Sequence, residues 1–494
     1  REDYTSEAAS ASETGAPERG NTGTGNRDPD ALPEGWVLSE KGSLAWAWDA
    51  DRIFVATRPQ QPSPGTLCEP GEGEKDGKAG KEGEGAGGEE AQGGEGSSDK
   101  EDSEGPKIVN LASRYDSLGR PLGPEEIWNG TCPEFVADVD IWHVDDDRLQ
   151  SVQMIRARRD RNRTFTSVVH VEGAGDQGEA RFVQLADESM EDLQVSDNGR
   201  AAMGRNDQPY ESDWEPGYAD YYQVNLDTGE RTPVLEKHLR TLGFSPDGES
   251  YLYWKDRNVW AYRPGTEEHV NLTEGFPVSL VNEEFDRLGE KPPHGIAGWT
   301  ADSSGVILEH RYDLYLQPLD GGDPVDLTDG AGAEREIRFR VLDMDPEDDL
   351  IDLTEPLVLS AYGQWTKKAG FFRLHPRESM SGGGPGAPEE LVWADARFGR
   401  PTRADSADVV LFTRQDFETF PDYHVAGLDF DDPVQVTDAN PQQERFNWGR
   451  RILFDYETED GVRLQGTLAI PYDYVEGEKR PMLINYYEKN SQNL

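Results

Sequence analysis

Positively charged residues are scarce in this sequence. Its 494 residues hold 49 Lys and Arg against 98 Asp and Glu, which gives a formal net charge of -49. Nucleic acids and anionic membranes bind to basic patches on proteins, so this composition excludes both as principal partners. Two interpretations of the acidic excess are open: a surface that stays hydrated in high salt, as in halophilic proteins, or a surface that binds cationic ligands. The spread of acidic residues along the whole chain favours the first.

Long apolar runs and cysteines are also few. No stretch approaches the roughly 20 apolar residues of a membrane-spanning helix, and no signal peptide stands at the start, where the first residue is Arg1. From this we expect a processed or cut N-terminus. Cys68 and Cys132 belong to no CxxC pair or metal-spaced cluster. A disulfide between them in an oxidising compartment and two separate free thiols are both open.

Composition divides the chain into segments. Residues 1–32 are rich in Ser, Thr, Gly and acidic residues, and we expect them to be disordered. Residues 66–107 form a Gly- and Glu-rich stretch without aromatic residues, which is typical of a flexible surface insertion. Around this insertion, residues 33–448 predict one β-rich domain: two alternating apolar runs stand in residues 35–59, and short strand patterns with hardly any helical periodicity follow from residue 141. Residues 449–494 have a different pattern.

An internal repeat is the strongest signal of the β-rich part. Residues 243–275 align without a gap to residues 298–330. Identical pairs include Gly243 and Gly298, Asp247 and Asp302, Leu272 and Leu327, Thr273 and Thr328, and Gly275 and Gly330.

Each copy contains only strand and turn signals. Ser245-Pro246-Asp247-Gly248 is typical of a type I turn. Residues 250–254 and 258–262 are rich in β-forming residues and predict two strands around a polar turn, and residues 269–273 predict a third. This is the content of a propeller blade.

Weaker copies occupy residues 163–188, 195–236 and 405–438. A blade leaves one face uncovered until its neighbour stacks on it, so a repeated all-strand unit predicts an all-β fold, a β-propeller of roughly seven or eight blades in the parent protein. A two-sheet sandwich is the alternative architecture.

The pattern changes after residue 448. Residues 451–474 predict a hairpin around Asp460-Gly461. The apolar run in residues 481–487, "PMLINYY", is typical of a strand buried on both faces of a parallel sheet. We therefore expect residues 449–494 to open an α/β domain.

These C-terminal motifs carry a resemblance. The sequence "DGVRLQG" (460–466), followed by "PYDYVEGEKRPMLINYY" (471–487), resembles the prolyl oligopeptidase family of serine peptidases, and is most similar to its dipeptidyl- and acylaminoacyl-peptidase-like bacterial members. Residues 140–153, 412–425 and 440–449 are similar to the same subgroup. The resemblance implies a propeller that caps an α/β-hydrolase domain, peptide substrates, no metal or organic cofactor, and a periplasmic or secreted location.

The sequence departs from this family at the catalytic residues. A hydrolase nucleophile stands in G-x-S-x-G, and that motif is absent from these residues. The Ser, Asp and His of a triad are therefore not assigned in this chain, which we expect to be a fragment that is inactive alone. The alternative is a non-enzymatic TolB-like or WD-like propeller that binds a protein partner.

Tyr487 is the one site residue that the resemblance assigns, as a hydroxyl donor of the oxyanion hole. The alternative is that Tyr486 and Tyr487 are ordinary strand aromatics, one packed inward and one facing outward. The eight His residues form no pair at metal-ligand spacing, and we expect His143 and His424 to be strand residues with local hydrogen bonds.

Overall fold

The computed structural model describes part of the chain in two compact units, which are treated separately. The described residues are 32–33, 35–48, 50–60, 142–144, 146, 148–171, 180–344, 350–376 and 386–487. One unit comprises residues 1–33, 38–57 and 164–494, and the other comprises residues 34–37 and 58–163. Cys68, Cys132, the insertion at 66–107 and nearly all of the predicted disordered tail lie outside the described residues.

The smaller unit contains a helix that the sequence pattern did not predict. Helix α2 (Gln150–Arg161) has no buried residue, and basic side chains fill its last turn. A cation there complements the negative end of the helix dipole. The expectation of strands from residue 141 onward is wrong at this point, because a helix without an apolar stripe has no periodic signal. His143 is exposed and belongs to no strand, which corrects a second expectation.

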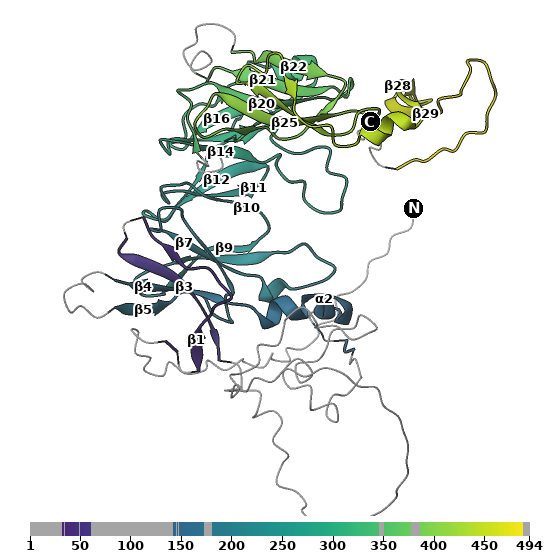
Figure 1. Cartoon of the computed structure of the whole chain (residues 1–494). Helices are drawn as coiled ribbons and strands as arrows, with labels where there is room; N and C mark the ends of the chain where they lie inside the picture. Colours follow the sequence, from purple (N-terminus) through teal and green to yellow (C-terminus); the bar gives the residue numbers. More distant parts are fainter. Residues whose placement is uncertain are drawn as a thin grey trace, which may run out of the picture. The chain divides into compact units, whose positions relative to one another are not determined.

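The described residues form six antiparallel sheets of four or five strands, with one added parallel strand, β19 (Figure 1). In chain order, the first sheet contains β1 (Trp36–Leu38), β2 (Ala45–Trp46), β3 (Arg52–Pro59), β4 (Phe165–His170) and β5 (Arg181–Gln184). The second contains β6 (Asp192–Val195), β7 (Ala202–Asn206), β8 (Ala219–Val224) and β9 (Arg231–His238), and the third β10 (Thr241–Phe244), β11 (Tyr251–Lys255), β12 (Asn258–Arg263) and β13 (Glu268–Asn271).

The remaining sheets follow the same plan. The fourth contains β14 (Ile296–Thr300), β15 (Gly305–Glu309), β16 (Leu314–Pro318), β17 (Val325–Asp326) and β19 (Leu350–Ile351). The fifth contains β18 (Ile337–Val341), β20 (Leu357–Gly363), β21 (Ala369–Leu374) and β22 (Glu389–Ala394), and the sixth β23 (Arg397–Phe398), β24 (Thr402–Arg403), β25 (Val409–Gln415), β26 (Asp422–Gly427) and β27 (Val434–Gln435). Short helices connect some strands: α3 (Ala331–Arg335), η4 (Gln208–Tyr210) and η5 (Pro441–Arg445). No helix among the described residues is long and apolar enough to cross a membrane.

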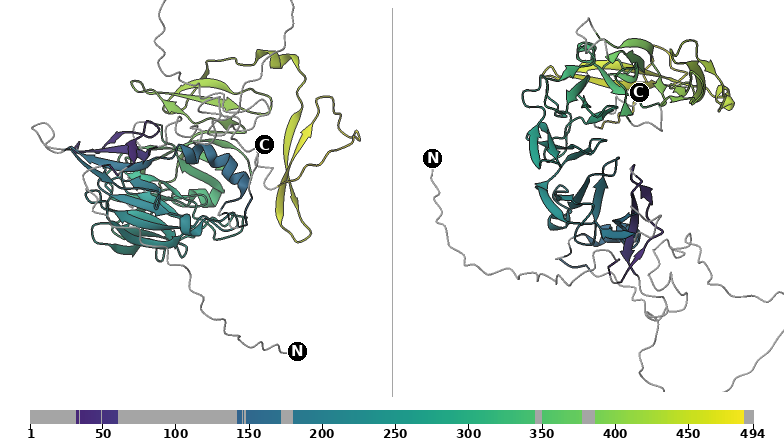
Figure 2. Two further views of the ribbon diagram at one scale, coloured as in Figure 1. Left: turned by 90° about the horizontal axis from the view of Figure 1, so that it is seen from below. Right: turned by 90° about the vertical axis from the view of Figure 1, so that its left-hand side faces the viewer.

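Consecutive sheets pack face to face. Figure 2 shows them following one another in the order of the chain. Each of five buried apolar clusters joins one sheet to the next, through the pairs Val168 with Ala202, Met203 with Tyr251, Leu252 with Val306, Ile307 with Phe339, and Phe371 with Phe412. This stacking of successive sheets is that of propeller blades, and the predicted all-β propeller fold is confirmed.

The repeat in the sequence corresponds to the third and fourth sheets, β10–β13 and β14–β17. The turn after the first strand is the same in both. The Ser245 hydroxyl accepts a hydrogen bond from Ser250 N at 3.0 Å, and Thr300 Oγ1 accepts one from Gly305 N at 2.9 Å. The second sheet repeats this bond from Ala201 N to the Ser196 hydroxyl at 3.0 Å. The [Ser/Thr]-x-[Asp/Asn] pattern therefore encodes a hydrogen-bonded turn.

A second repeated contact links the third strand of a sheet to the residues after its fourth strand. Thr328 Oγ1 donates to Asp313 Oδ1 at 2.9 Å, and Gly332 N donates to the same oxygen at 2.7 Å. Thr273 donates to Asn258 in the third sheet, and Thr437 donates to Asp422 in the sixth. Asp313 is 1% exposed, so these bonds replace the hydration of a buried carboxylate.

The two ends of the sheets differ. We call "turn end" the end at which the first strand connects to the second and the third to the fourth. We call "loop end" the end at which the second strand connects to the third and the chain crosses to the next sheet. At the turn end, Asn198 donates to the Asp247 carbonyl of the next sheet. At the loop end, Arg311 pairs with Glu284 at 2.7 Å.

Candidate functional site

A two-stranded hairpin, β28 (Arg450–Glu457) and β29 (Arg463–Ile470), follows the sixth sheet. It has the predicted turn, in which Gly461 has a positive φ of 78°. One of its faces contacts the loop end of the fifth sheet. Gln465 Nε2 donates to the Trp365 carbonyl at 2.7 Å, and the Arg463 guanidinium lies 4.0 Å from the centre of the Trp365 ring. Residues from the β20–β21 turn therefore position the hairpin.

Charged groups complete this contact. Arg463 pairs with Asp455 across the hairpin at 3.2 Å, and the Arg451 guanidinium lies 4.9 Å from the centre of the Phe417 ring in the β25–β26 loop. Burial lowers the pKa of Lys367, while the charge of Asp455 acts in the opposite direction. The polar face of the hairpin is thus held by cation–π contacts to Trp365 and Phe417, which belong to two neighbouring sheets.

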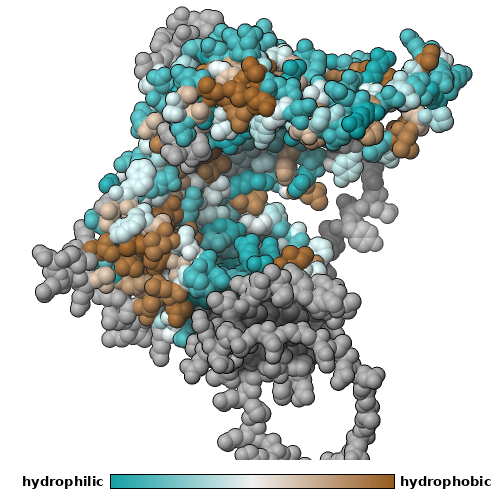
Figure 3. Space-filling view, viewed as in Figure 1, coloured by the Kyte–Doolittle hydropathy of each residue, from teal (hydrophilic) through white to brown (hydrophobic). Residues whose placement is uncertain are grey.

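The opposite face of the hairpin is apolar and uncovered. The register places Ile452 opposite Leu468 and Tyr456 opposite Leu464, with Phe454 between them opposite a glycine. These five side chains are between 37% and 47% exposed. Side chains alternate between the faces of a strand, so all five lie on one face. Figure 3 shows a mostly hydrophilic surface with separate apolar patches, the largest of them over the sheets.

Residues 481–487 form no strand in the structure of this chain, so the opening strand of an α/β domain stays a prediction. Leu483 is 96% exposed and Ile484 is 71% exposed. Tyr486 and Tyr487 are 89% and 76% exposed, and no hydrogen bond to the Tyr487 hydroxyl is found among the described residues. A strand of this kind needs neighbouring strands on both sides for its backbone hydrogen bonds, and the described residues supply none.

A cluster of charged and imidazole groups lies between the fourth and fifth sheets at the loop end. Arg340 Nε lies 3.1 Å from Glu309 Oε2, and the rings of His294 and His310 are 6.2 Å apart. His310 Nδ1 is buried without a hydrogen bond, with Asp313 Oδ2 at 4.0 Å.

Burial dominates the electrostatics of this cluster. It raises the pKa of Glu309 and lowers that of Arg340, although each stabilises the charge of the other. Burial, with the nearby Arg340 charge, lowers the pKa of His294 to about 4, and burial also lowers the pKa of His310. Both imidazoles are therefore neutral at pH 7. No sequence motif indicates this cluster, because its members come from distant strands.

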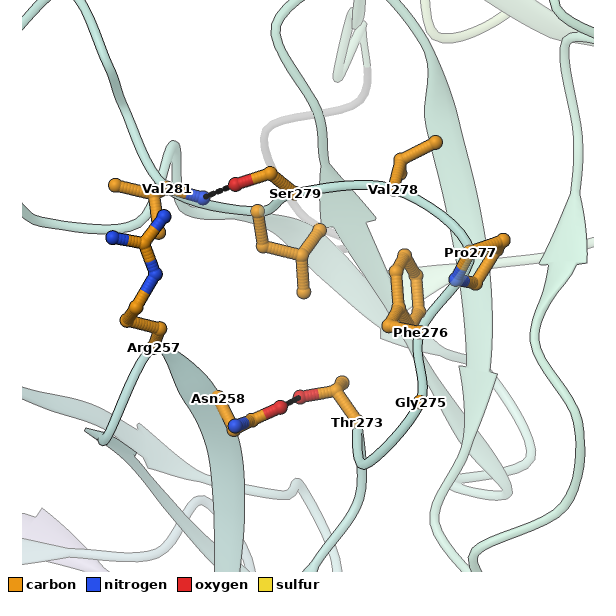
Figure 4. A pocket seen from close by; sticks show the side chains of 10 residues that line it. Arg257, Asn258, Thr273, Gly275, Phe276, Pro277, Val278, Ser279 and Val281 are labelled. Atoms are coloured by element: carbon orange, nitrogen blue, oxygen red, sulfur yellow. Dashed lines mark hydrogen bonds between the residues drawn. The ribbon is translucent and has the colours of Figure 1, made fainter.

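The loop end also contains a pocket of about 380 Å³ beside the third sheet. In Figure 4, Arg257 and Phe276 stand on opposite sides of it, and Thr273 donates to Asn258 at its edge. Arg257 also pairs with Glu283 at 3.0 Å. A guanidinium beside an apolar wall could bind a small ligand with a negatively charged end. The charge of Arg257, however, is already paired with that of Glu283.

His424 lies in β26, as predicted. Its ring stacks on Phe412, with 5.8 Å between the ring centres, and its Nδ1 lies 3.1 Å from the Asp422 carbonyl. This is a packing role. Within the described ranges, no group of three His, Cys, Asp or Glu side chains is placed to hold a metal ion.

Comparisons with known proteins found solved structures that are similar to this chain at low sequence identity. The sequence matches no protein-family model and no curated protein. Among solved structures, the chain is similar to dipeptidyl peptidase 4 of Porphyromonas gingivalis, with 11% identity, a TM-score of 0.29 and coverage of 63% of this chain and 62% of that chain. It thus spans less than two thirds of that enzyme.

Two further structures are similar to this chain. A putative TolB from Agrobacterium tumefaciens has 16% identity and a TM-score of 0.25 over 59% of this chain and 94% of that one. The β-propeller domain of the Trilobed protease from Pyrococcus furiosus has 13% identity and a TM-score of 0.27 over 64% of this chain and 89% of that one.

Proposed function

We propose that this chain is the propeller portion of a serine peptidase of the prolyl oligopeptidase type. In this proposal the stacked sheets form a cap that filters peptide substrates, and the hairpin β28–β29 leads into an α/β-hydrolase domain that supplies the Ser, Asp and His triad. The chain by itself is inactive, because it contains no G-x-S-x-G nucleophile motif.

The observation that carries the proposal is the two-sided character of the hairpin. Its polar face is held at the loop end through Arg463, Gln465 and Trp365, whereas its apolar face, including Phe454 at 45% exposure, is uncovered. An isolated two-stranded hairpin is marginally stable in water and needs a further layer against its apolar face. A hydrolase sheet is a layer of this kind, and the motifs of the hairpin resemble those that open such a domain.

The chemistry follows from the proposed class. A serine hydroxyl activated by a histidine attacks the peptide carbonyl, the amine product leaves, and water then hydrolyses the acyl-enzyme. Tyr487 is proposed to donate its hydroxyl hydrogen to the oxyanion that develops on the carbonyl oxygen. For this role residues 481–487 must become a strand of the added domain, which orders a side chain that is 76% exposed here.

The experiment compares two proteins. One is this chain, and the other is a gene product that continues in frame past Leu494 and contains G-x-S-x-G. Hydrolysis of fluorogenic dipeptide and acylaminoacyl substrates is measured for both, with a Ser→Ala variant of the longer protein as control. We expect activity from the longer protein alone. Peptide hydrolysis by residues 1–494 alone, or peptide binding without hydrolysis by the longer protein, would contradict the proposal, and the second result would favour the scaffold alternative.

A further inference from the structure

Two neighbouring loops at the loop end expose large apolar side chains. Trp214, in the loop between β7 and β8, is 86% exposed, and Leu288, in the crossover between β13 and β14, is 101% exposed. The loops approach each other, because a Cβ at Gly289 would lie 3.9 Å from Pro216 Cγ. We call Trp214, Pro216 and Leu288 the Trp214–Leu288 patch. Figure 1 shows loops of this part of the chain projecting to one side of the sheets.

The first of these loops is fixed at its base. The Tyr210 hydroxyl donates to Asp220 Oδ1 at 2.8 Å, and Lys237 N donates to the same oxygen at 2.8 Å. Lys237 Nζ lies 5.7 Å from the centre of the Tyr210 ring and 5.3 Å from that of Tyr218. The base of the loop therefore already holds an ammonium close to two aromatic rings.

The tip of the loop offers the same chemistry at the surface. No Lys or Arg stands between Asn206 and Tyr218, and Asp213 and Glu215 flank Trp214. Indole is the aromatic group that attracts cations most strongly. The methylene stem of a Lys or Arg side chain would pack against apolar neighbours such as Leu288 while its charged end stays solvated.

We propose that the Trp214–Leu288 patch is a docking surface for Lys and Arg side chains of peptides, so that the peptides this protein handles are cationic. The inference rests on the proposed function for the peptide nature of the ligand. Charge complementarity selects this occupant: Asp213 and Glu215 flank Trp214, the charges of Asp286 and Arg287 beside Leu288 offset each other, and the chain has a net charge of -49, which attracts cationic peptides and repels anionic ones. Because side-chain charge is recognised, a blocked peptide N-terminus does not prevent binding.

Fluorescence anisotropy tests the inference on the whole 494-residue chain. The probe is a fluorescein-labelled hexapeptide with blocked ends that contains Lys and Arg, and the comparison peptide has Gln at those positions. We expect the cationic peptide to bind about tenfold more tightly at low salt, with affinity falling as salt rises. Trp214→Ala should weaken binding roughly three- to tenfold, as expected for one cation–π contact, and Glu215→Gln should weaken it less.

Trp48→Ala is the matched control. Trp48 is 69% exposed in the β2–β3 turn, at the turn end, and its loss should leave binding unchanged. Equal binding of the two peptides, or equal losses for Trp214→Ala and Trp48→Ala, would overturn the inference. Circular dichroism of each variant confirms that it is folded. Because only binding is measured, an absence of peptidase activity in the longer gene product would contradict the proposed function and not this result.

Discussion

The two ends of the sheets are built differently. At the turn end, three consecutive sheets close with the same hydrogen-bonded turn, at Ser196, Ser245 and Thr300. At the loop end, the connections differ from sheet to sheet, and they carry the exposed Trp214 and the contacts that hold the hairpin. A repeated turn stabilises each blade in the same way, whereas variable loops on a rigid scaffold are where binding residues concentrate. We therefore assign most of the repeated stabilising contacts to the turn end and the binding residues to the loop end.

The largest effect on stability is expected at Asp313, which is an exception to this division because it lies at the loop end and stabilises the fold. Asp313→Ala removes the acceptor of Thr328 Oγ1, Gly332 N and Ala333 N. Gly332 N and Ala333 N lose this acceptor, while Thr328 Oγ1 keeps its 3.1 Å bond to Asp326, so the free energy of unfolding should fall by about 3 kcal/mol in urea titrations. Asp313→Asn should recover part of the loss, because Asn258 fills the equivalent position in the third sheet.

The control for this experiment is Asp323→Ala, which changes an exposed carboxylate of the same sheet. It should change stability by no more than about 0.5 kcal/mol. If Asp313→Ala were as stable as this control, the repeated Thr–Asp contact would not contribute to stability.

Glycines at the two ends give a direct comparison. Gly248 at the turn end has a φ of 71°, and a Cβ there would lie 2.8 Å from the Ser196 hydroxyl oxygen. Gly275 at the loop end has a φ of 76° with open space around it. Replacement by Ala should cost about 2 kcal/mol at Gly248 and about 1 kcal/mol at Gly275, because only the first adds a clash to the backbone strain. Equal melting-temperature shifts would show that the turn end is not the more tightly packed one.

The free energy of unfolding should fall as the pH is lowered from 6.5 to about 4, because of two histidines at the loop end. His294 has a folded pKa of about 4, below the unfolded value, so only the unfolded chain takes up this proton as the pH falls through that range. His310 acts in the same direction. The charged groups that the two rings face are Arg340, Arg311, Glu284 and Asp313.

The loss of unfolding free energy should be about 1–2 kcal/mol once partial solvent exposure is allowed for. Urea titrations at pH 7, 5.5 and 4.5 measure it. The double variant His294→Gln and His310→Gln should show a flatter pH dependence than the parent protein. Identical slopes would exclude these two groups as its cause.

The smallest effect concerns two arginines. Arg463→Ala removes the cation–π contact with Trp365, worth roughly 0.5–1 kcal/mol, and hydrogen exchange should accelerate in β28–β29 without a change elsewhere. Arg403→Ala removes only an exposed pair with Asp408 at the turn end, and it should change exchange by less. The reverse order would contradict the assignment of Arg463 to positioning the hairpin.

Much of the blade structure could be predicted from the sequence, because strand pattern and turn chemistry are local. The repeat located β10–β13 and β14–β17, and the hairpin turn was visible at Asp460-Gly461. The fifth sheet was not recognised as a copy, since a long connection that includes β19 separates β18 from β20. Helix α2 has no buried stripe, so periodicity did not reveal it.

The site was less predictable. Glu309 and Arg340 meet across two sheets, and no sequence spacing encodes such a contact. Residues 481–487 have the composition of a buried strand, but composition does not supply the neighbouring strands that they need. The role of Tyr487 therefore stays a proposal.

Hydrogen exchange of the hairpin in two proteins tests the central claim most directly. Backbone amides of β28 and β29 are followed in this chain and in the gene product that continues past Leu494. If a hydrolase domain covers the apolar face, protection of these strands should rise at least about a hundredfold in the longer protein, while the buried strands β11 and β15 change little. Equal protection of the hairpin in both proteins would contradict the account.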